Sequence, residues 1–255
     1  MPKQYRALLP GQCYDVYVLD LRVFTFLLMT KLDFYGLHSY KLESDTYPGK
    51  LIVIEGTDGV GRTTQALMLR SWLESQGHAV VDTGAARSEL AGKGIKRAKE
   101  GHTLGPITLS LFYATDFADR FEKQILPALK AGFIVLNDRY IYSLIARAIV
   151  RGVDPHWLTE LYGTALKPDI VFYLKISVKD LIPRVLGAKG FNYWEAGMDL
   201  KLGNDLYESF VNYQSRVIDQ LDKMSKEYNF VEIDATKEPQ DVFLDIKNRI
   251  SEILV

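Results

Sequence analysis

From about residue 49 onward, short runs of apolar residues alternate with longer amphipathic stretches. The run at residues 51–55 is β-branched and almost wholly apolar, which is typical of a buried parallel strand. Similar runs predict four more strands, at residues 78–83, 133–137, 170–176 and 230–233. Helical spacing of apolar residues predicts helices at residues 63–76, 107–130 (broken near Pro127), 155–166, 204–227 and 239–254. Strands that alternate with helices predict an α/β fold, a five-stranded parallel sheet with helices on both faces.

The most apolar N-terminal stretch, residues 14–29, is interrupted by charged side chains. Its longest uncharged run covers residues 23–29, far short of the roughly 20 residues that span a bilayer. A signal peptide also needs a small-residue cleavage site, which is missing around Met29. Two interpretations stay open: this stretch forms a buried strand or helix, or Met29 is the natural start and residues 1–28 are upstream translation.

Pro48 and Gly49 interrupt the pattern just before the first strong strand, and we place a domain boundary there. Residues 1–48 are then an N-terminal extension, and residues 49–255 form one α/β domain.

Composition narrows the class of protein further. Of the 255 residues, 47% are hydrophobic and 25% charged, which excludes a fully disordered chain. The formal net charge is −1, so no overall basic field attracts nucleic acid or an anionic membrane, and neither is expected as a partner. The single cysteine, Cys13, cannot form an intrachain disulfide, and a reducing, cytoplasmic setting fits best.

A glycine-rich segment follows the first strand directly. Its sequence GTDGVGRTT has the spacing G-x-x-x-x-G-K-[ST], except that Arg62 replaces the lysine. Glycines let backbone N–H groups curl around a phosphate, and the next helix directs its positive N-terminal dipole at the same anion. We expect ATP phosphates to contact Gly56, Thr57, Asp58, Gly59, Val60, Gly61, Arg62, Thr63 and Thr64. The alternative is a glycine-rich turn that binds no ligand.

Two positions in this segment have particular chemistry. Thr63 stands where the motif places a ligand of Mg²⁺. Arg62 keeps the positive charge of the usual lysine, as a planar fork on a longer stem, and can still bridge two phosphates. A loop that binds nucleotide without supporting transfer remains the alternative.

The third predicted strand ends in Asp138 and Arg139. Ligands of open parallel sheets bind beyond the carboxyl ends of the strands, so this pair is expected to face the glycine-rich loop. Asp138 could orient the Mg²⁺ shell, and Arg139 could hold a second, acceptor phosphate. A surface salt-bridged pair is the alternative.

Residues 49–255 resemble the thymidylate kinase family of nucleoside monophosphate kinases, which have a three-layer phosphate-loop NTPase fold. The resemblance rests on motifs in order along the chain: IEGTDGVGRTTQ, ILPAL with a following glycine, DRY, PDIVFYL and FVEIDAT. In detail the chain is similar to a divergent subgroup with arginine in the phosphate loop, ATDFADR, YWEAGMDL and an early DFYG. DFYG, at residues 33–36, makes residues 33–49 a lead-in to the domain.

The resemblance implies transfer of the ATP γ-phosphoryl group to the 5′-phosphate of dTMP, with Mg²⁺. It implies that Asp58 contacts the sugar 3′-hydroxyl, that Arg139 binds the acceptor phosphate and that Tyr113 stacks on the base. Ser143 matches the serine that follows DRY. A homodimer packed through helices is implied as well.

Other positions depart from the family's pattern. Gly84 replaces a phosphate-binding arginine, for which Arg87 could substitute. Phe117 stands where a base-reading arginine is expected, so we expect Tyr113 and Phe117 to sandwich the ring while Arg147 donates to the base edge. The other interpretation of Arg147 is a solvated helix residue. These departures put the identity of the base in doubt more than the type of reaction.

A lid that excludes water is expected at about residues 184–203. Its glycines at 187, 190, 197 and 203 would serve as hinges. Arg184 and Lys189 are its available cations and are expected, with Arg62, Asp138 and Arg139, to form the catalytic set. Trp194 is interpreted as a core residue. Two further functions stay open: a regulatory nucleotide-binding protein with little transferase activity, and a kinase for another nucleotide.

Overall fold

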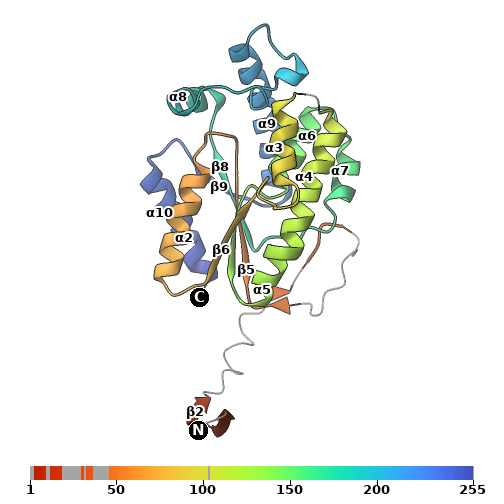
Figure 1. Ribbon diagram of the computed structural model, residues 1–255. Helices are drawn as coiled ribbons and strands as arrows, with labels where there is room; N and C mark the ends of the chain where they lie inside the picture. The colour runs from red at the N-terminus through yellow and green to blue at the C-terminus, as the bar shows by residue number, and fades with distance from the viewer. Residues whose placement is uncertain are drawn as a thin grey trace.

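The computed structural model describes residues 33–36, 46–102 and 104–254 in full, and the backbone alone of residues 3–9, 12–18 and 30–31. Within these residues, five parallel strands form one sheet in the order β6–β7–β5–β8–β9. Their bounds are β5 Lys50–Glu55, β6 Val80–Gly84, β7 Ile134–Asp138, β8 Ile170–Lys175 and β9 Val231–Asp234. The predicted α/β fold with a parallel sheet is confirmed (Figure 1).

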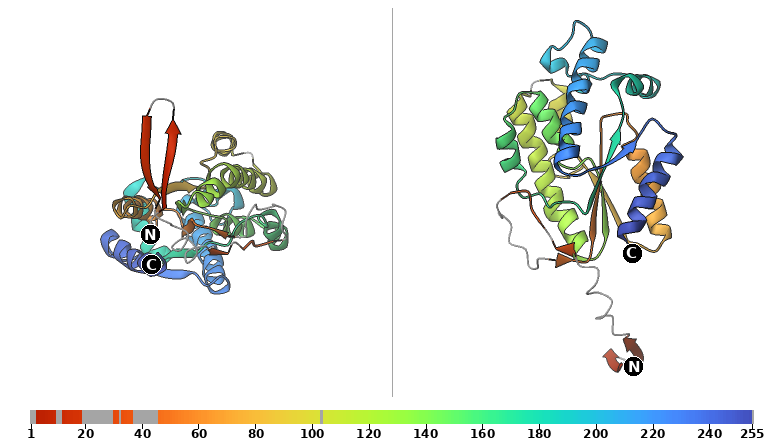
Figure 2. Two further views of the ribbon diagram at one scale, coloured as in Figure 1. Left: turned by 90° about the horizontal axis from the view of Figure 1, so that it is seen from below. Right: turned by 180° about the vertical axis from the view of Figure 1, so that it is seen from behind.

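Helices cover both faces of the sheet, and Figure 2 shows the three layers from behind. One layer contains α2 (Arg62–Ser75) and α10 (Pro239–Ile253). The opposite layer contains α4 (Pro106–Arg120), α5 (Leu126–Lys130), α6 (Tyr142–Val150), α7 (Pro155–Leu161) and α9 (Leu206–Glu227). Two further helices, α3 (Gly92–Glu100) and α8 (Val178–Ala188), lie toward the carboxyl ends of the strands. No helix in the described part of the chain combines the length and apolarity that a membrane crossing needs.

The central strand β5 divides the core in two. Leu51 and Val53 pack with the α4–α9 layer, whereas Ile52 and Ile54 pack with the α2–α10 layer. Successive side chains of a strand point to opposite faces, so a strand covered on both sides must be apolar throughout. This is why the run at residues 51–55 shows no polar alternation.

The long helix predicted at residues 107–130 is three elements. Between α4 and α5 the chain forms a π-helical segment, Phe121–Ile125, and Pro127 follows in the first turn of α5. Proline lacks the N–H that the α-helical pattern requires and its ring crowds the carbonyl four residues earlier, so the ladder widens there. Helix α6 was not predicted: none of its side chains is exposed, and it has no polar face to reveal a helical period.

At the N-terminus, β1 (Lys3–Leu9) and β2 (Gln12–Val18) pair antiparallel, and β3 (Thr30–Lys31) pairs with β4 (Thr46–Tyr47). Residues 14–18 lie in strand β2, of which the backbone alone is described, and residues 19–29 lie outside the described residues, so a buried strand or helix at residues 14–29 stays a prediction. Initiation at Met29 stays a prediction.

The predicted lead-in makes direct contact with the domain. Phe34 is buried and bridges Leu166, and the Gly36 N–H donates to the Gly163 carbonyl at 2.9 Å. A Cβ on Gly36 would lie 2.6 Å from the Gly163 Cα, so this crossing of two backbones requires glycine.

Candidate functional site

The glycine-rich loop connects β5 to α2 at the carboxyl edge of the sheet, as predicted. Three of its glycines have positive φ: 148° at Gly56, 81° at Gly59 and 106° at Gly61. These left-handed conformations explain why glycine occupies the positions. A Cβ at Gly61 would meet nothing within 4 Å, so the space beside the first turn of α2 is open. An open N-terminal turn after a glycine-rich loop fits a phosphate group.

Arg62 is buried and reaches back across the loop. Its Nε donates to Asp138 Oδ1 at 2.9 Å, and its Nη1 donates to the carbonyl oxygens of Gly56 (2.5 Å) and Thr57. The guanidinium therefore ties the loop to the end of β7. This bridge needs the planar guanidinium, whose separate N–H groups point at Asp138 and at the loop carbonyls. A lysine ammonium is a single point charge and lacks this geometry.

Thr63 and Asp138, the two predicted metal ligands, are brought together. The Thr63 Oγ1 donates to Asp138 Oδ2 at 2.7 Å. Burial raises the pKa of Asp138, but the charge of Arg62 and the Thr63 hydrogen bond outweigh it and hold the pKa below its usual value. Asp138 is therefore a carboxylate at neutral pH. Hydroxyl and carboxylate oxygens are the ligands that Mg²⁺ prefers, so the pair fits that ion.

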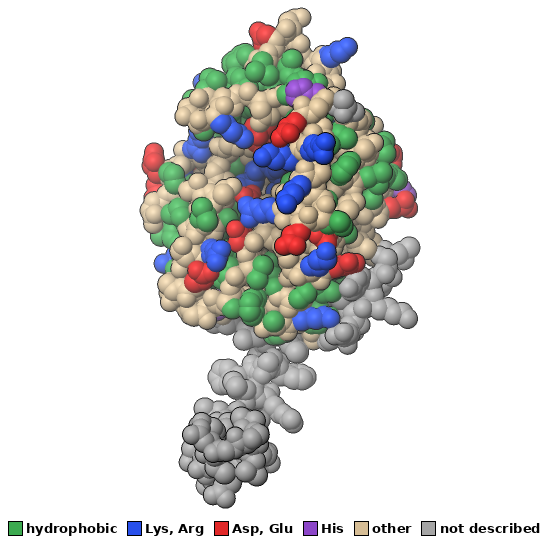
Figure 3. Space-filling model, in the orientation of Figure 1, with side chains coloured by type: hydrophobic (Ala, Val, Ile, Leu, Met, Phe, Trp, Pro, Cys, Tyr) green, Lys and Arg blue, Asp and Glu red, His purple; other side chains and the backbone are tan. Residues whose placement is uncertain are grey.

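Asp58 lies at the centre of a cluster of arginines. Arg139 and Arg147 each donate an Nη2 hydrogen bond to its carboxylate, and the Arg62 Nη2 lies 3.6 Å from its Oδ1. Burial raises the pKa of Asp58, yet the charges of Arg139, Arg147 and Arg62 hold it well below its usual range. Three cations around one carboxylate leave an excess of positive charge, which suits an anionic ligand. Figure 3 shows lysine and arginine side chains gathered around a hollow in this face of the molecule.

Arg139 reaches the cluster through a local distortion of the chain. Its φ is +72°, a conformation that residues other than glycine, Asn and Asp rarely adopt. Its backbone N–H donates to the Ile54 carbonyl at 3.0 Å, which holds the end of β7 against β5. Strained backbone of this kind persists only where the surroundings enforce it, and it is concentrated at functional sites.

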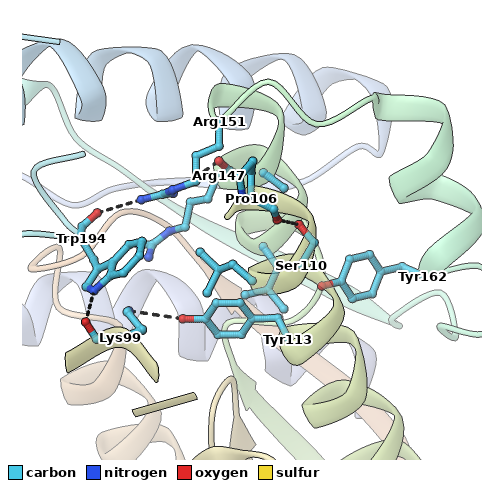
Figure 4. A pocket seen from close by; sticks show the side chains of 11 residues that line it. Lys99, Pro106, Ser110, Tyr113, Arg147, Arg151, Tyr162 and Trp194 are labelled. Carbon is cyan, nitrogen blue, oxygen red and sulfur yellow. Dashed lines mark hydrogen bonds between the residues drawn. The ribbon is translucent and has the colours of Figure 1, made fainter. Parts of the chain in front are cut away.

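A pocket opens beside this cluster, between α4 and α6 (Figure 4). We call it the inner pocket; it has a volume of about 30 Å³. Tyr113 from α4, which the resemblance implied would stack on the base, and Arg147 from α6, which we expected at the base edge, both line it. Its wall also includes Lys99, Arg151 and Trp194, which the sequence analysis did not assign to a site.

Two predicted substrate residues lie elsewhere. Phe117 is 2% exposed and packs edge-on against Tyr140 and Tyr162 in the core, so it does not form a sandwich with Tyr113. It lies one helical turn after Tyr113, where α4 meets the sheet layer. Ser143 is fully buried beneath the site, with its N–H 3.4 Å from Glu55 Oε1, and does not line the inner pocket.

The three remaining predicted cations lie at different distances from the loop. Arg87, 39% exposed at its side chain, has its Nη2 3.5 Å from Asp138 Oδ2 and borders the site. Arg184 donates to the carbonyl oxygens of Val60 (3.5 Å) and Thr236 (3.2 Å), so it flanks the loop. Lys189 is not brought to the loop: its side chain is 60% exposed and pairs with Glu195 at 2.8 Å.

The expected lid corresponds to the end of α8 and the chain up to α9. Two of its predicted hinge glycines are packing positions instead. A Cβ on Gly197 would lie 2.5 Å from the Tyr213 ring, and one on Gly203 would lie 2.5 Å from the Ser209 nitrogen. Gly187 has no neighbour within 4 Å of such a Cβ. The segment is therefore held firmly against α9 at its C-terminal end.

Residues missed from the sequence share one property: they come from different elements and meet only in the folded chain. Trp194 was interpreted as core, and it is indeed only 7% exposed, but one side of it faces the inner pocket. The motif YWEAGMDL was the one signal that could have identified it.

A strand, a glycine-rich loop and a helix, with Thr63 beside Asp138 and a cluster of arginines around Asp58 nearby, define a phosphate-loop α/β protein. Comparison with known proteins then specifies the family. Residues 54–246 match the family model described as thymidylate kinase, and the chain belongs to the thymidylate kinase family.

Named relatives agree with this assignment. The chain is 41% identical over 208 residues to "Probable thymidylate kinase 2" of Saccharolobus solfataricus, covering 81% of this chain and 97% of that protein. It is 41% identical over 147 residues to "Probable thymidylate kinase" of Thermococcus kodakarensis (54% and 72%). It is 28% identical over 209 residues to "Thymidylate kinase" of Brachyspira hyodysenteriae (80% and 94%).

Proposed function

We propose that this chain transfers the γ-phosphoryl group of ATP to the 5′-phosphate of dTMP, with Mg²⁺ as cofactor. The observation that carries the proposal is the meeting of two anion sites at one edge of the sheet. The loop with Thr63 and Asp138 forms one, and Arg139 beside Asp58 forms the other, next to the inner pocket. The family of the chain and the names of its relatives support this reaction.

On the donor side, the loop N–H groups and the N-terminus of α2 bind the ATP phosphates. Thr63 and Asp138 would hold Mg²⁺, which neutralises charge on the phosphate oxygens. Arg62 keeps the loop in its curved form through Gly56 and Thr57 and supplies positive charge there. Arg184, beside Val60, is placed to add charge at the same loop.

On the acceptor side, Arg139 binds the phosphate that attacks. That phosphate is already anionic, so no side chain needs to remove a proton from it. Because Asp58 pairs with Arg139 and Arg147, an incoming phosphate competes for these arginines and releases the carboxylate toward the sugar hydroxyl. Tyr113 provides a ring face for the base, and Arg147 provides donors at its edge.

The direct test is phosphoryl transfer from MgATP to dTMP, with dUMP, dCMP, dGMP and dAMP measured in parallel. We expect dTDP as the preferred product. Thr63→Ala should lower kcat by about a hundredfold, because it removes an oxygen ligand and the hydrogen bond to Asp138. Thr115→Ala is the matched control, since its hydroxyl bonds only the Leu111 carbonyl within α4.

Each outcome decides a different point. Preference for another monophosphate would keep the mechanism and change the substrate. ATP binding without any product would refute the proposed transfer and favour a regulatory nucleotide-binding protein.

We also propose a homodimer in a reducing, cytoplasmic setting, on the basis of the family resemblance and the single cysteine. Light scattering of the purified chain measures its oligomeric state. A monomer at micromolar concentration would contradict it.

A further inference from the structure

The loop between β6 and α3 carries Arg87 to the edge of the site. A Cβ on Gly84 would clash with the Asp138 carbonyl oxygen and would lie 3.3 Å from the Arg87 Nε. Residue 84 therefore has no room for a side chain, and the Arg87 guanidinium occupies the space beside it. Within the same loop, Ala86 has a φ of +63°, a left-handed conformation that alanine rarely adopts and that its surroundings must enforce.

The carboxylate of Asp116, on helix α4, holds this loop through two backbone hydrogen bonds. The Ala86 N–H donates to its Oδ2 and the Ser88 N–H donates to its Oδ1, each at 2.9 Å. These two donors lie on either side of Arg87 in the chain. Because one rigid carboxylate accepts from both, the backbone of Arg87 is fixed relative to α4. Asp116 itself is fully buried, so water does not compete for either bond.

Arg120, one helical turn further along α4, holds Asp116 in turn. Its Nε donates to Asp116 Oδ2 at 3.0 Å, and both side chains are fully buried. The Arg120 Nη1 and Nη2 have no hydrogen-bond partner among the described residues. Burying a guanidinium with unfilled donors is costly, so this pair is unfavourable as a purely stabilising contact.

The guanidinium of Arg87 points from the loop toward the glycine-rich segment. Its Nη1 lies 3.1 Å from both carboxylate oxygens of Asp82, and its Nη2 lies 3.5 Å from Asp138 Oδ2. Asp138 also accepts the hydrogen bond of Thr63. Because the Arg87 side chain is 39% exposed, it can exchange the longer of these contacts for a ligand.

We propose that Asp116 and Arg120 are positioning residues, which act through the backbone of residues 86–88 to aim Arg87 at the acceptor phosphate. This inference rests on the proposed function and deepens it. Both residues belong to the motif ATDFADR, which has no part in the phosphate sites described above. Asp116 and Arg120 order the loop before the nucleotide arrives, so binding does not have to supply the entropy of ordering it. Displacing a group that positions substrate by about 1 Å is enough to lower the rate strongly.

The test is a double-mutant cycle in steady-state kinetics, with wild type, Arg87→Ala, Asp116→Asn and the double variant. Asparagine keeps the shape of Asp116, but its Nδ2 cannot accept, so one of the two loop hydrogen bonds is lost. The KM for dTMP should rise about tenfold in Arg87→Ala and about fivefold in Asp116→Asn, while the KM for ATP stays unchanged. The double variant should have the same KM for dTMP as Arg87→Ala, because Asp116 acts only through Arg87.

Asp169→Asn is the matched control for loss of a structural carboxylate. Asp169 also accepts from a backbone N–H, that of Leu51 at 2.7 Å, and pairs with a cation, Lys50. It directly precedes β8, at the opposite edge of the sheet from the glycine-rich loop. This variant should lose stability without any change in the KM for dTMP.

A purely structural role for Asp116 would change kcat alone or both KM values alike, or would add to the effect of Arg87→Ala in the double variant. Any of these results overturns the inference, and so does an unchanged KM for dTMP in Asp116→Asn. If Asp116→Asn does not fold, Arg120→Lys takes its place in the cycle, since it replaces the planar guanidinium that holds Asp116 by a point charge. An unchanged KM for dTMP in Arg120→Lys then overturns the inference.

Calorimetric titration of dTMP without ATP separates this inference from the proposed function. If the wild type makes no dTDP, the proposed function fails, and the Kd for dTMP through the same cycle then decides. A Kd that Asp116→Asn weakens only when Arg87 is present supports the positioning role. A Kd that Asp116→Asn leaves unchanged, or no binding of dTMP to the wild type, refutes it.

Discussion

Replacing Asp58 with asparagine tests the arginine cluster most directly. In the wild type this carboxylate is buried and accepts from Arg139 and Arg147, with Arg62 close by. Removing its charge leaves three guanidinium groups facing one another. Breaking a buried ion pair typically costs 3–5 kcal/mol, and because asparagine keeps one acceptor oxygen we expect a loss of about 3 kcal/mol. For a chain of this size that lowers the Tm by roughly 6–12 °C.

The assay is urea and thermal denaturation of wild type and Asp58→Asn at low ionic strength. Asp82→Asn is the matched control: its partner Arg87 is 39% exposed, so the change should cost at most about 1 kcal/mol. Inorganic phosphate should raise the stability of Asp58→Asn more than that of the wild type, because the variant lacks the carboxylate that competes with phosphate for the arginines. An anion that binds only the folded state stabilises that state by mass action. Equal stability of wild type and Asp58→Asn, or equal losses in the two variants, would refute the reasoning.

The pH dependence gives a second check on the same variant. The pKa of Asp58 is held well below its usual range, against the effect of burial, by its arginines. A group whose folded pKa is depressed contributes stability that is present above its unfolded pKa, about 3.9, and is lost only as pH falls through the folded value. The difference between wild type and Asp58→Asn should therefore stay constant from pH 5 to pH 8. A difference that shrinks within this interval would contradict the depressed pKa.

Three further changes probe other parts of the site. Arg147→Ala should raise the KM for dTMP about tenfold or more in steady-state kinetics and leave the KM for ATP unchanged; an unchanged KM for dTMP would remove Arg147 from the acceptor site. Burial raises the pKa of Glu55 above its usual value despite the charge of Arg62. The contribution of Glu55 to the stability of the fold is therefore complete below its unfolded pKa and is lost as pH rises through the folded value. Glu55→Gln should accordingly gain stability relative to wild type between pH 5 and pH 8, and a constant difference in urea denaturation would speak against it. Gly197→Ala should cost about 2–4 kcal/mol from its positive φ and the adjacent Tyr213, whereas Gly187→Ala, in open space within α8, should not destabilise the fold.

Local patterns were sufficient for most of the secondary structure and for the glycine-rich loop with its neighbouring residues. A buried parallel strand, a glycine-rich turn and the helix after it are encoded within one continuous stretch, residues 50–75, and β5, the loop and α2 form as predicted. Asp138 could also be placed beside Thr63, because the carboxyl ends of parallel strands meet at one edge of the sheet. Helix α6 was missed because burial on all sides removes the periodic contrast on which such predictions depend.

The surroundings of the inner pocket depended on packing between elements distant in the chain. Phe117 and Tyr113 share helix α4, yet only the packing of that helix decides that Phe117 enters the core while Tyr113 lines the pocket. Trp194 meets Lys99 and Arg151 from three separate segments, and no local pattern specifies that meeting.

The sequence by itself thus determined the fold, the glycine-rich loop and the meeting of Thr63 with Asp138, since each follows from residues adjacent in the chain or from the common direction of the strands. Only the tertiary structure decided that Arg62 folds back onto its own loop, that three arginines surround Asp58 and that an indole closes the inner pocket. Long side chains have several rotamers, and the charges and surfaces that folding brings near determine which rotamer is populated.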